Sequence, residues 1–339
     1  MPTFRTATVT ELLQERPGLQ RIDTDLGRAY ALTQLTGPVA VGDRVVLNTT
    51  AVELGLGTGG WHVVHWNTER DTFVEPGPGH IMKLRYTSLQ VDAGSTEEHD
   101  PSSATDLGGM PVVVGGLHSQ VPGVAAAIRA VAPDARLTYV MTDGAALPMV
   151  ISDLVEAMTS SGLIDATITA GHAFGGDLEA VSVPSALALA RHATQADIAI
   201  VAMGPGVVGT SSPLGTSALE VAAVLDAAAA LGGRPVAVLR MSDGDERERH
   251  QGVSHHSRTA LDLTRSTVLV AAPSEGVYDH PRHDVRVVEG PDVPALLVAR
   301  GLHVTTMGRG PAEDPLFFRA TAAAGALAAS LLSLPSTTG

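Results

Sequence analysis

Residues 196–233 read ADIAIVAM, GPGVVGTSSPLG and TSALEVAAVLDAAAALGG, which are an apolar run, a glycine-rich turn and an alanine-rich segment. The run Ile198–Met203 shows no alternation of apolar and polar residues, and this predicts a strand covered on both faces of a parallel sheet. Glycines and prolines then interrupt regular structure, and a helix is expected over Ser217–Leu231. The unit of strand, loop and helix predicts an α/β fold.

The same rhythm runs through the chain from residue 110 onward. Strands are expected at Pro111–Val114, Leu137–Met141, Asp165–Thr169, Ile198–Met203, Pro235–Leu239 and Thr267–Ala271, with two more at Val285–Val288 and His303–Thr306. Helices are expected at Pro122–Val131, Pro148–Ser160, Pro184–Thr194, Ser217–Leu231 and Ser254–Thr264. Strands roughly 30 residues apart with helices between them predict a mainly parallel, doubly wound, Rossmann-like sheet.

The first 95 residues have a different texture. Short strand-like segments such as Arg28–Gln34, Asp43–Leu47 and Trp61–Trp66 lie between glycine- and proline-rich turns, and only Thr10–Glu15 suggests a helix. We expect a small β-barrel or β-sandwich over residues 1–95, then a linker or exposed loop over 96–109. The α/β domain over 110–335 would carry the functional site.

The segment His80–Gln90 reads as one more strand of this first module. Polar residues alternate along it, so that Lys83 and Arg85 would project together from one face of the strand. An ordinary solvent-facing surface is the favoured interpretation of this pair.

Composition bounds the function. The net charge is −14, from 22 basic and 36 acidic residues, which disfavours a nucleic-acid partner. The absence of cysteine excludes disulfides, thiol catalysis and thiolate metal sites. No signal-peptide core opens the chain, and Phe317–Leu334 contains Arg319, so a buried helix is expected there rather than a membrane span. We expect a cytoplasmic protein without a membrane partner, and a homo-oligomer stays open.

Ligands of open α/β sheets bind beyond the carboxyl ends of the strands. Five consecutive expected strand ends carry glycine together with polar or titratable residues. In chain order these ends hold His118 and Ser119; Asp143; His172, Asp177 and Glu179; the loop from Gly204 to Ser212; and Arg240 with Asp243. Arg309 follows the last expected strand. Such a concentration predicts a site at this edge of the sheet.

The glycine-rich loop matches neither common nucleotide motif. Gly204-Pro205-Gly206-Val207-Val208-Gly209 has the spacing G-x-G-x-x-G, but it follows the fourth strand, and its proline removes an N–H group. No nicotinamide or flavin signature is present. One interpretation is a tight turn that needs positive φ. The other is an anion site near a helix start, formed by Gly204, Gly206, Gly209, Thr210, Ser211 and Ser212 with His118, Ser119, Arg240 and Arg309.

The segment Arg240–Ala260 reads RMSDGDERERHQGVSHHSRTA and contains three histidines. Imidazoles act as general bases near neutral pH or as metal ligands, so His255 and His256 with Asp243 could hold a divalent metal. Neighbours on a helix diverge by about 100°, so His255 and His256 are not both expected to face one centre. The alternative is a solvated loop whose histidines bond backbone groups.

Two further strand ends leave alternatives open. Asp177 and Glu179 could orient His172 or bind metal, or Asp177 could cap a turn. Asp143 could be a base, an acceptor for a ribose hydroxyl or a turn residue.

Several strings resemble those of an uncharacterised bacterial family that is known only as a domain of unknown function and is frequent in Gram-positive bacteria. They are NTTAVELGLGTGG, GHIMKLRYT, MTDGAALP, TAGHAFGGDLEAV, MGPGVVGT, RHQGVSHHSRTAL and TTMGRG, and they run from Asn48 to Gly310. The resemblance covers most of the chain and implies no particular activity.

The first functional hypothesis is an enzyme that binds a small anionic, perhaps phosphorylated, metabolite and performs hydrolysis or group transfer. Its catalytic groups would come from His172, Asp143, Asp177, Glu179, Asp243, His250 and His255. The alternative is a non-catalytic sensor or regulatory protein that uses the same crevice. The density of histidines favours the enzyme, because binding alone needs donors and shape more than titratable groups.

Overall fold

The computed structural model describes residues 2–56, 59–99 and 104–333. The chain divides into two units, Met1–Gly94 and Ser95–Gly339.

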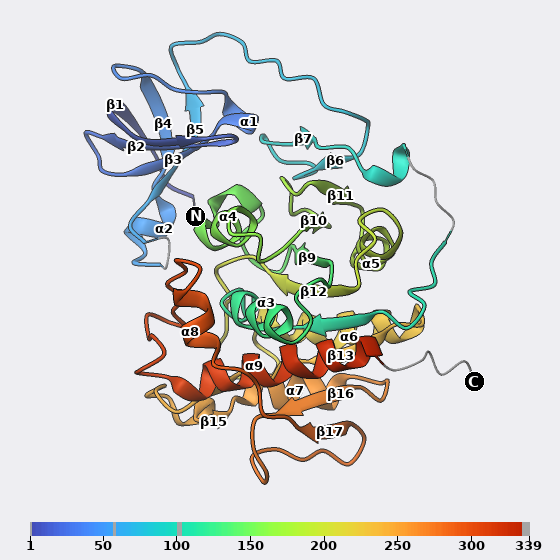
Figure 1. Ribbon diagram of the computed structural model, residues 1–339. Coiled ribbons are helices and arrows are strands. Elements are labelled where there is room, and N and C mark those ends of the chain that lie inside the picture. Colours follow the sequence, from blue (N-terminus) through green and yellow to red (C-terminus); the bar gives the residue numbers. More distant parts are fainter. Residues whose placement is uncertain (1, 57–58, 100–103, 334–339) are drawn as a thin grey trace. The chain divides into compact units, whose positions relative to one another are not determined.

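The first unit is a closed five-stranded barrel (Figure 1). Its strands are β1 (Phe4–Arg16), β2 (Leu19–Thr24), β3 (Ala29–Leu32), β4 (Arg44–Asn48) and β5 (His62–Asn67), with one-turn helices α1 (Thr33–Thr36) and α2 (Thr50–Glu53). The order around the barrel is β1-β2-β3-β5-β4, and only β3 and β5 pair in parallel. This is the strand order of the OB-type Greek-key barrel. Val9, Ile22, Val45 and Leu47 fill the interior, and the prediction of a small barrel is confirmed.

Two local predictions in this unit are wrong. Thr10–Glu15 is not a helix, because it lies within β1, which pairs with β2 and β4 and so holds the backbone extended. His80–Gln90 is not one strand: only β6 (Met82–Lys83) pairs, with β7 (Val91–Asp92). Leu84 and Tyr86 have φ of 52° and 62°, which breaks the strand. Lys83 is consequently buried while Arg85 is exposed, and the two share no face.

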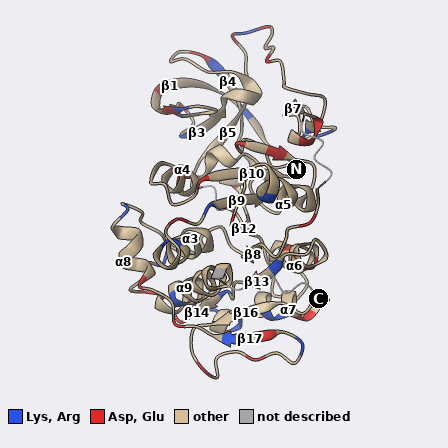
Figure 2. Cartoon of the chain, turned by 45° about the vertical axis from the view of Figure 1, so that its right-hand side comes forward, with Lys and Arg blue, Asp and Glu red and all other residues tan. Residues whose placement is uncertain are grey.

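The second unit is built on an eight-stranded, all-parallel sheet, which confirms the predicted α/β fold. Its strands are β8 (Pro111–Val114), β9 (Leu137–Thr142), β10 (Ala166–Ala170), β11 (Leu178–Ala180), β12 (Ile198–Met203), β13 (Arg234–Ala237), β16 (Leu269–Ala272) and β17 (Asp284–Val287). They lie in the order β11-β10-β9-β12-β8-β13-β16-β17. The central strands carry no charged residue and appear uniformly tan in Figure 2.

Helices cover both faces of this sheet (Figure 1). One face packs on α3 (Gln120–Val131), α4 (Asp153–Ser160), α8 (Val293–Val298) and α9 (Pro315–Ser330). The other packs on α5 (Val183–His192), α6 (Glu220–Ala230) and α7 (His255–Leu263). Two buried cores result, as expected for a doubly wound sheet.

Helices α3 and α9 approach each other closely at two glycines (Figure 1). A Cβ atom on Gly123 would collide with the side chain of Thr321, and one on Gly325 would collide with the carbonyl oxygen of Val124. The absence of a side chain at these positions lets the two backbones meet.

Three other parts of the second unit differ from expectation. His303–Thr306 is not a strand, since Thr306 pairs only with Arg309 in an isolated bridge. Strand β11 and the hairpin of β14 (Met241–Ser242) and β15 (Gly252–Val253) were expected as loops. The apolar segment Phe317–Leu334 is largely buried as α9 and a short 3-10 turn, and Leu334 lies outside the described residues. Among the described helices, none has the length and hydropathy needed to cross a membrane.

The topology creates an opening at the middle of the sheet. The four adjacent strands β9, β12, β8 and β13 lead alternately to helices on opposite faces: α4, α6, α3 and α7. Because consecutive loops turn away from one another, a crevice forms beyond the carboxyl ends of these strands. The loops that follow these four strands therefore line the site.

Candidate functional site

The loop after β12 is a self-supporting hairpin, which we call the glycine flap (residues 204–217). Gly209 and Thr216 form an isolated antiparallel bridge. The N–H of Thr210 donates to the carbonyl of Gly215 at 2.7 Å, and that of Ser217 to the carbonyl of Val208 at 3.0 Å. The tip is exposed. Since several of its N–H groups are used within the flap, donors for an anion must come largely from elsewhere.

Three histidines come together opposite the flap. His250 ends a short 3-10 turn, and His255 and His256 open helix α7. Each offers a ring nitrogen, and these atoms all lie within 4.8 Å of one another. Ser254 caps α7 by accepting the N–H of His256 at 3.3 Å, and its hydroxyl also contacts Nδ1 of His250 at 2.8 Å.

The expectation that His255 and His256 diverge is wrong, because their ring centroids are 4.3 Å apart. The angle of about 100° separates the Cβ directions of helical neighbours. The imidazole rings extend beyond Cβ and turn back toward each other over His250, whose ring centroid is 5.1 Å from that of His255.

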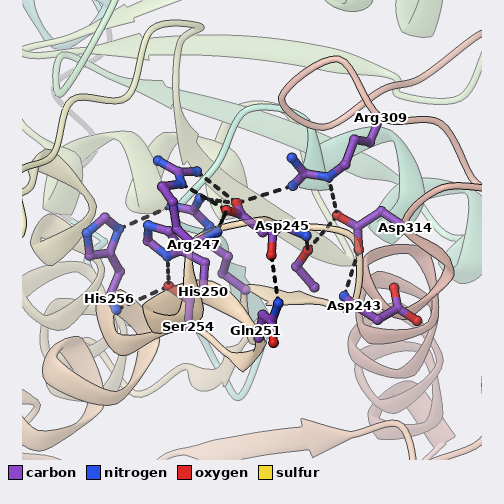
Figure 3. A network of polar contacts seen from close by, with 11 residues as sticks. Asp243, Asp245, Arg247, His250, Gln251, Ser254, His256, Arg309 and Asp314 are labelled. Atoms are coloured by element: carbon purple, nitrogen blue, oxygen red, sulfur yellow. Dashed lines mark hydrogen bonds and ion pairs between the residues drawn. The ribbon is translucent and has the colours of Figure 1, made fainter.

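The proton of His256 can be placed from its contact with Arg240. Nη1 of Arg240 lies 3.2 Å from Nδ1 of His256 (Figure 3). A guanidinium can only donate, so Nδ1 accepts, and the neutral imidazole carries its proton on Nε2. Burial, and then the charge of Arg240, lower the pKa of His256 to about 4, so the ring is neutral at physiological pH.

This Nε2–H group has no acceptor. His256 is only 4% exposed, and its Nε2 is buried without a hydrogen-bond partner. It faces the flap: a Cβ on Gly209 would lie 2.9 Å from Cε1 and 3.3 Å from Nε2 of the ring. A small cavity begins here, and its walls include Gly116, Ala218, Arg240 and His256. An oxygen atom of a ligand is the acceptor that this donor lacks.

An arginine cluster surrounds the histidines (Figure 3). Arg247 binds Asp245 through two hydrogen bonds of 2.8 and 2.7 Å, and Arg309 reaches the same carboxylate at 3.3 Å. These contacts hold the pKa of Asp245 far below its usual range. Arg240 is 3.9 Å from Asp245, too far for a hydrogen bond, and burial lowers its pKa to about 10. Arg240 is therefore a buried cation with weak compensation.

Beside Asp245 the network continues to Asp314, which is fully buried. Its carboxylate accepts from Nε of Arg309 at 3.0 Å and from the hydroxyl of Ser242 at 2.7 Å. The N–H of Asp243 adds a third bond at 3.1 Å. Three arginines thus share two buried carboxylates, and this leaves an excess of positive charge next to His256.

A second group of polar side chains lies at the carboxyl end of β9. The hydroxyl of Thr142 donates to Oε1 of Glu220 at 2.6 Å, and Oδ2 of Asp143 accepts the N–H of His172 at 2.9 Å. Burial raises the pKa of Glu220 to about 7, and the charge of Asp143 raises it further. Sequence reasoning missed Glu220, because an acidic residue at the first position of a helix is ordinary stabilisation of the helix dipole.

The remaining predicted residues have contacts within the fold. His118 lies in the sheet core, where its Nε2 contacts Ser152 at 2.7 Å and its Nδ1 contacts Tyr139 at 3.1 Å. Burial lowers the pKa of His118 to about 4. Ser119 precedes α3 without a capping hydrogen bond from its side chain. Asp177 accepts the N–H and hydroxyl of Thr167, both at 2.8 Å.

Glu179 and Asp243 likewise bond neighbouring backbone. Glu179 accepts the N–H of Gly175 at 2.6 Å and holds the turn between β10 and β11. Asp243 accepts the N–H of Leu316 at 3.2 Å, near the start of α9. The structure thus brings together Arg240, His250, His255 and His256, with Gly209 against them.

Metal binding is chemically open to the three histidines, which form the one such group within the described part of the chain; Asp243 is not a member. A metal on Nε2 of His256 would require the proton to move to Nδ1, where the donor Arg240 sits. Ligating histidines normally donate their other N–H to an acceptor, and neighbouring arginines repel a dication. The geometry favours an anion over a cation.

We therefore expect the protein, purified without chelators, to contain far less than one zinc, manganese or iron ion per chain by elemental analysis. Exposure to zinc followed by desalting should leave this ratio low. A near-stoichiometric metal that disappears in a His255→Ala, His256→Ala double variant would contradict the assignment of the proton to Nε2.

A family model described as "Protein of unknown function (DUF3866)" matches residues 28–325. The match confirms the resemblance to an uncharacterised family that the sequence strings indicate. No curated protein matches the chain significantly.

Proposed function

The chain belongs to the DUF3866 family, whose description names no activity, and from the site alone we propose an enzyme that binds a small anionic metabolite at the carboxyl edge of its parallel sheet. The anionic group is carboxylate or phosphate. The reaction is hydrolysis or group transfer.

The unpaired Nε2–H of His256 carries this proposal. A buried donor without an acceptor costs about 1–3 kcal/mol. An oxyanion in front of His256 would remove that cost, and the flap has glycine at the position where a side chain would fill the space. The contact from Arg240 keeps the ring in the donating tautomer.

Charge supports the same ligand class. The chain as a whole has a net charge of −14. Around Asp245, by contrast, Arg240, Arg247 and Arg309 outnumber the two buried carboxylates of Asp245 and Asp314. Anions are steered to such a local excess of positive charge even on an acidic protein.

Titratable groups at the same edge favour an enzyme over a sensor. His255 adjoins His256, and Glu220, whose pKa is raised to about 7, lies at the next loop but one along the sheet. Groups with shifted pKa values concentrate at catalytic sites. Proton transfer by such groups serves hydrolysis and group transfer without a redox cofactor.

Anion titration by isothermal calorimetry tests the binding step. We expect Arg240→Gln to weaken sulfate and phosphate binding roughly 10-fold or more, because a hydrogen bond to a charged group contributes about 1.5–3 kcal/mol. Arg258→Gln is the matched control, since Arg258 is an exposed cation on the same helix as His256. Equal weakening in both variants would reduce the effect to net charge and contradict a built site.

Turnover is tested with panels of small phosphate monoesters and carboxylic esters. Catalysis that His255→Ala and Glu220→Gln both reduce supports the enzyme. Anion binding without turnover of any member of either panel would favour the sensor instead.

A further inference from the structure

Two carboxyl groups are built into the carboxyl end of β9 with unusual care. A Cβ atom on Gly144 would collide with Oε2 of Glu220, and one on Gly171 would collide with Oδ2 of Asp143. Each carboxyl group thus occupies a recess that exists because a glycine stands there. The two recesses fix both groups in position before any ligand arrives.

The two groups differ in their surroundings. Asp143 is exposed, whereas Glu220 is mostly buried and accepts one hydrogen bond, from Thr142. Burial is the main cause of the raised pKa of Glu220, and the charge of Asp143 adds to it. Tyr139 of β9 also interacts electrostatically with Glu220, but burial raises its own pKa well above the usual value, so it stays neutral. His172 presents its N–H to Asp143 from the loop beyond β10.

The glycine flap connects this pair to the anion site. The N–H of Ala146, in the loop that carries Asp143, donates to the carbonyl of Pro205 at the base of the flap at 3.0 Å. Further along, Gly209 lies against the ring of His256. Ala218, two residues before Glu220, forms part of the cavity wall beside Arg240. Glu220 and His256 therefore border one continuous structure.

We propose that Glu220 is the acid–base residue of the anion site and that it takes up a proton when an anion binds there. The proposal rests on the anion site described above. A bound anion disfavours the ionised carboxylate, so binding draws a proton from solvent onto Glu220. That proton is then held at the edge of the site, where it can pass to an oxygen atom of the ligand.

The pH window follows from the position of the titration. Near pH 5 Glu220 is already protonated, and an anion causes no uptake of protons. Since its pKa is about 7, the group is partly ionised at pH 7–8, and uptake is largest there. Sulfate is the suitable probe, because it does not itself titrate in this range.

The experiment is calorimetric titration of sulfate into the full-length protein at pH 5 and pH 7.5, in two buffers of different ionisation enthalpy. The heat should depend on the buffer at pH 7.5 and not at pH 5. Glu220→Gln should bind sulfate with no dependence on the buffer at either pH. Glu156→Gln, an exposed glutamate on α4, is the matched control and should keep the full proton uptake.

Sulfate binding without proton uptake in the wild type, or uptake that persists in Glu220→Gln, overturns the role of Glu220 alone. No sulfate binding in any protein refutes the anion site instead. A ligand-free readout separates the two cases. Because the folded pKa lies above the unfolded value of about 4.5, wild-type stability falls as pH rises from about 4.5 to 7. Glu220→Gln should therefore melt above the wild type at pH 8 but not at pH 5, and an equal difference at both would count against Glu220.

Discussion

Replacing Asp314 with alanine is expected to lower the free energy of unfolding of the α/β unit by about 3–5 kcal/mol. The carboxylate is fully buried and accepts from Arg309, from the hydroxyl of Ser242 and from the N–H of Asp243. Its removal leaves a guanidinium without its closest partner and a buried hydroxyl without an acceptor. The loss should also loosen Asp245, because Arg309 bridges the two carboxylates.

Urea denaturation followed by far-UV circular dichroism measures this effect in the correct unit. All described helices longer than four residues lie in the α/β unit, whereas both tryptophans, Trp61 and Trp66, lie in the barrel unit. Tryptophan fluorescence of the same samples is therefore an internal control that should not change. Asp284→Ala removes an exposed ion pair with Arg286 and should cost less than about 1 kcal/mol. A loss for Asp314→Ala as small as that of Asp284→Ala would contradict the account of the network.

Replacing Gly209 with valine is expected to weaken sulfate binding roughly 100-fold or more, which corresponds to a loss of about 2.7 kcal/mol or more. A Cβ at this position already lies 2.9 Å from the ring of His256, and the two methyl groups of valine extend further into the space in front of Nε2. The valine would displace the ligand oxygen and shift the ring that donates to it.

Ser211→Val is the control for this substitution, because it adds the same side chain to the exposed tip of the same flap. Calorimetry should show sulfate binding to Ser211→Val within about 2-fold of the wild type. Gly209→Val should retain the far-UV spectrum, since the flap lies outside the cores. Wild-type affinity in Gly209→Val would mean that anions bind somewhere other than between the flap and His256.

The sequence was sufficient for most of the sheet. Strands β8 and β12 lie where their continuous apolar runs predict them, because a strand buried on both faces leaves no other pattern. The prediction of a strand at His303–Thr306 was wrong, since a short alternating segment becomes a strand only where a neighbour offers a pairing edge. Strand β11 was missed for the converse reason: three residues carry too little pattern, and pairing with β10 decides.

The site was less accessible to prediction. Strand-end reasoning found the histidines, Arg240 and the flap, because topology alone collects those loops at one edge. It could not find the tautomer of His256 or the burial of Glu220, which depend on contacts between residues far apart in sequence. It also could not distinguish His118, which completes the core of the sheet, from a residue that faces a ligand.

The close packing of α3 on α9 has a consequence for biosynthesis. Helix α3 follows the first strand of the sheet to leave the ribosome, while its partner in the glycine-to-backbone contact is the last long helix to emerge. During translation the apolar surface of α3 therefore stays uncovered until the ribosome has made nearly the whole unit. Its final core forms after synthesis, and the nascent chain presents a long-lived binding surface to chaperones.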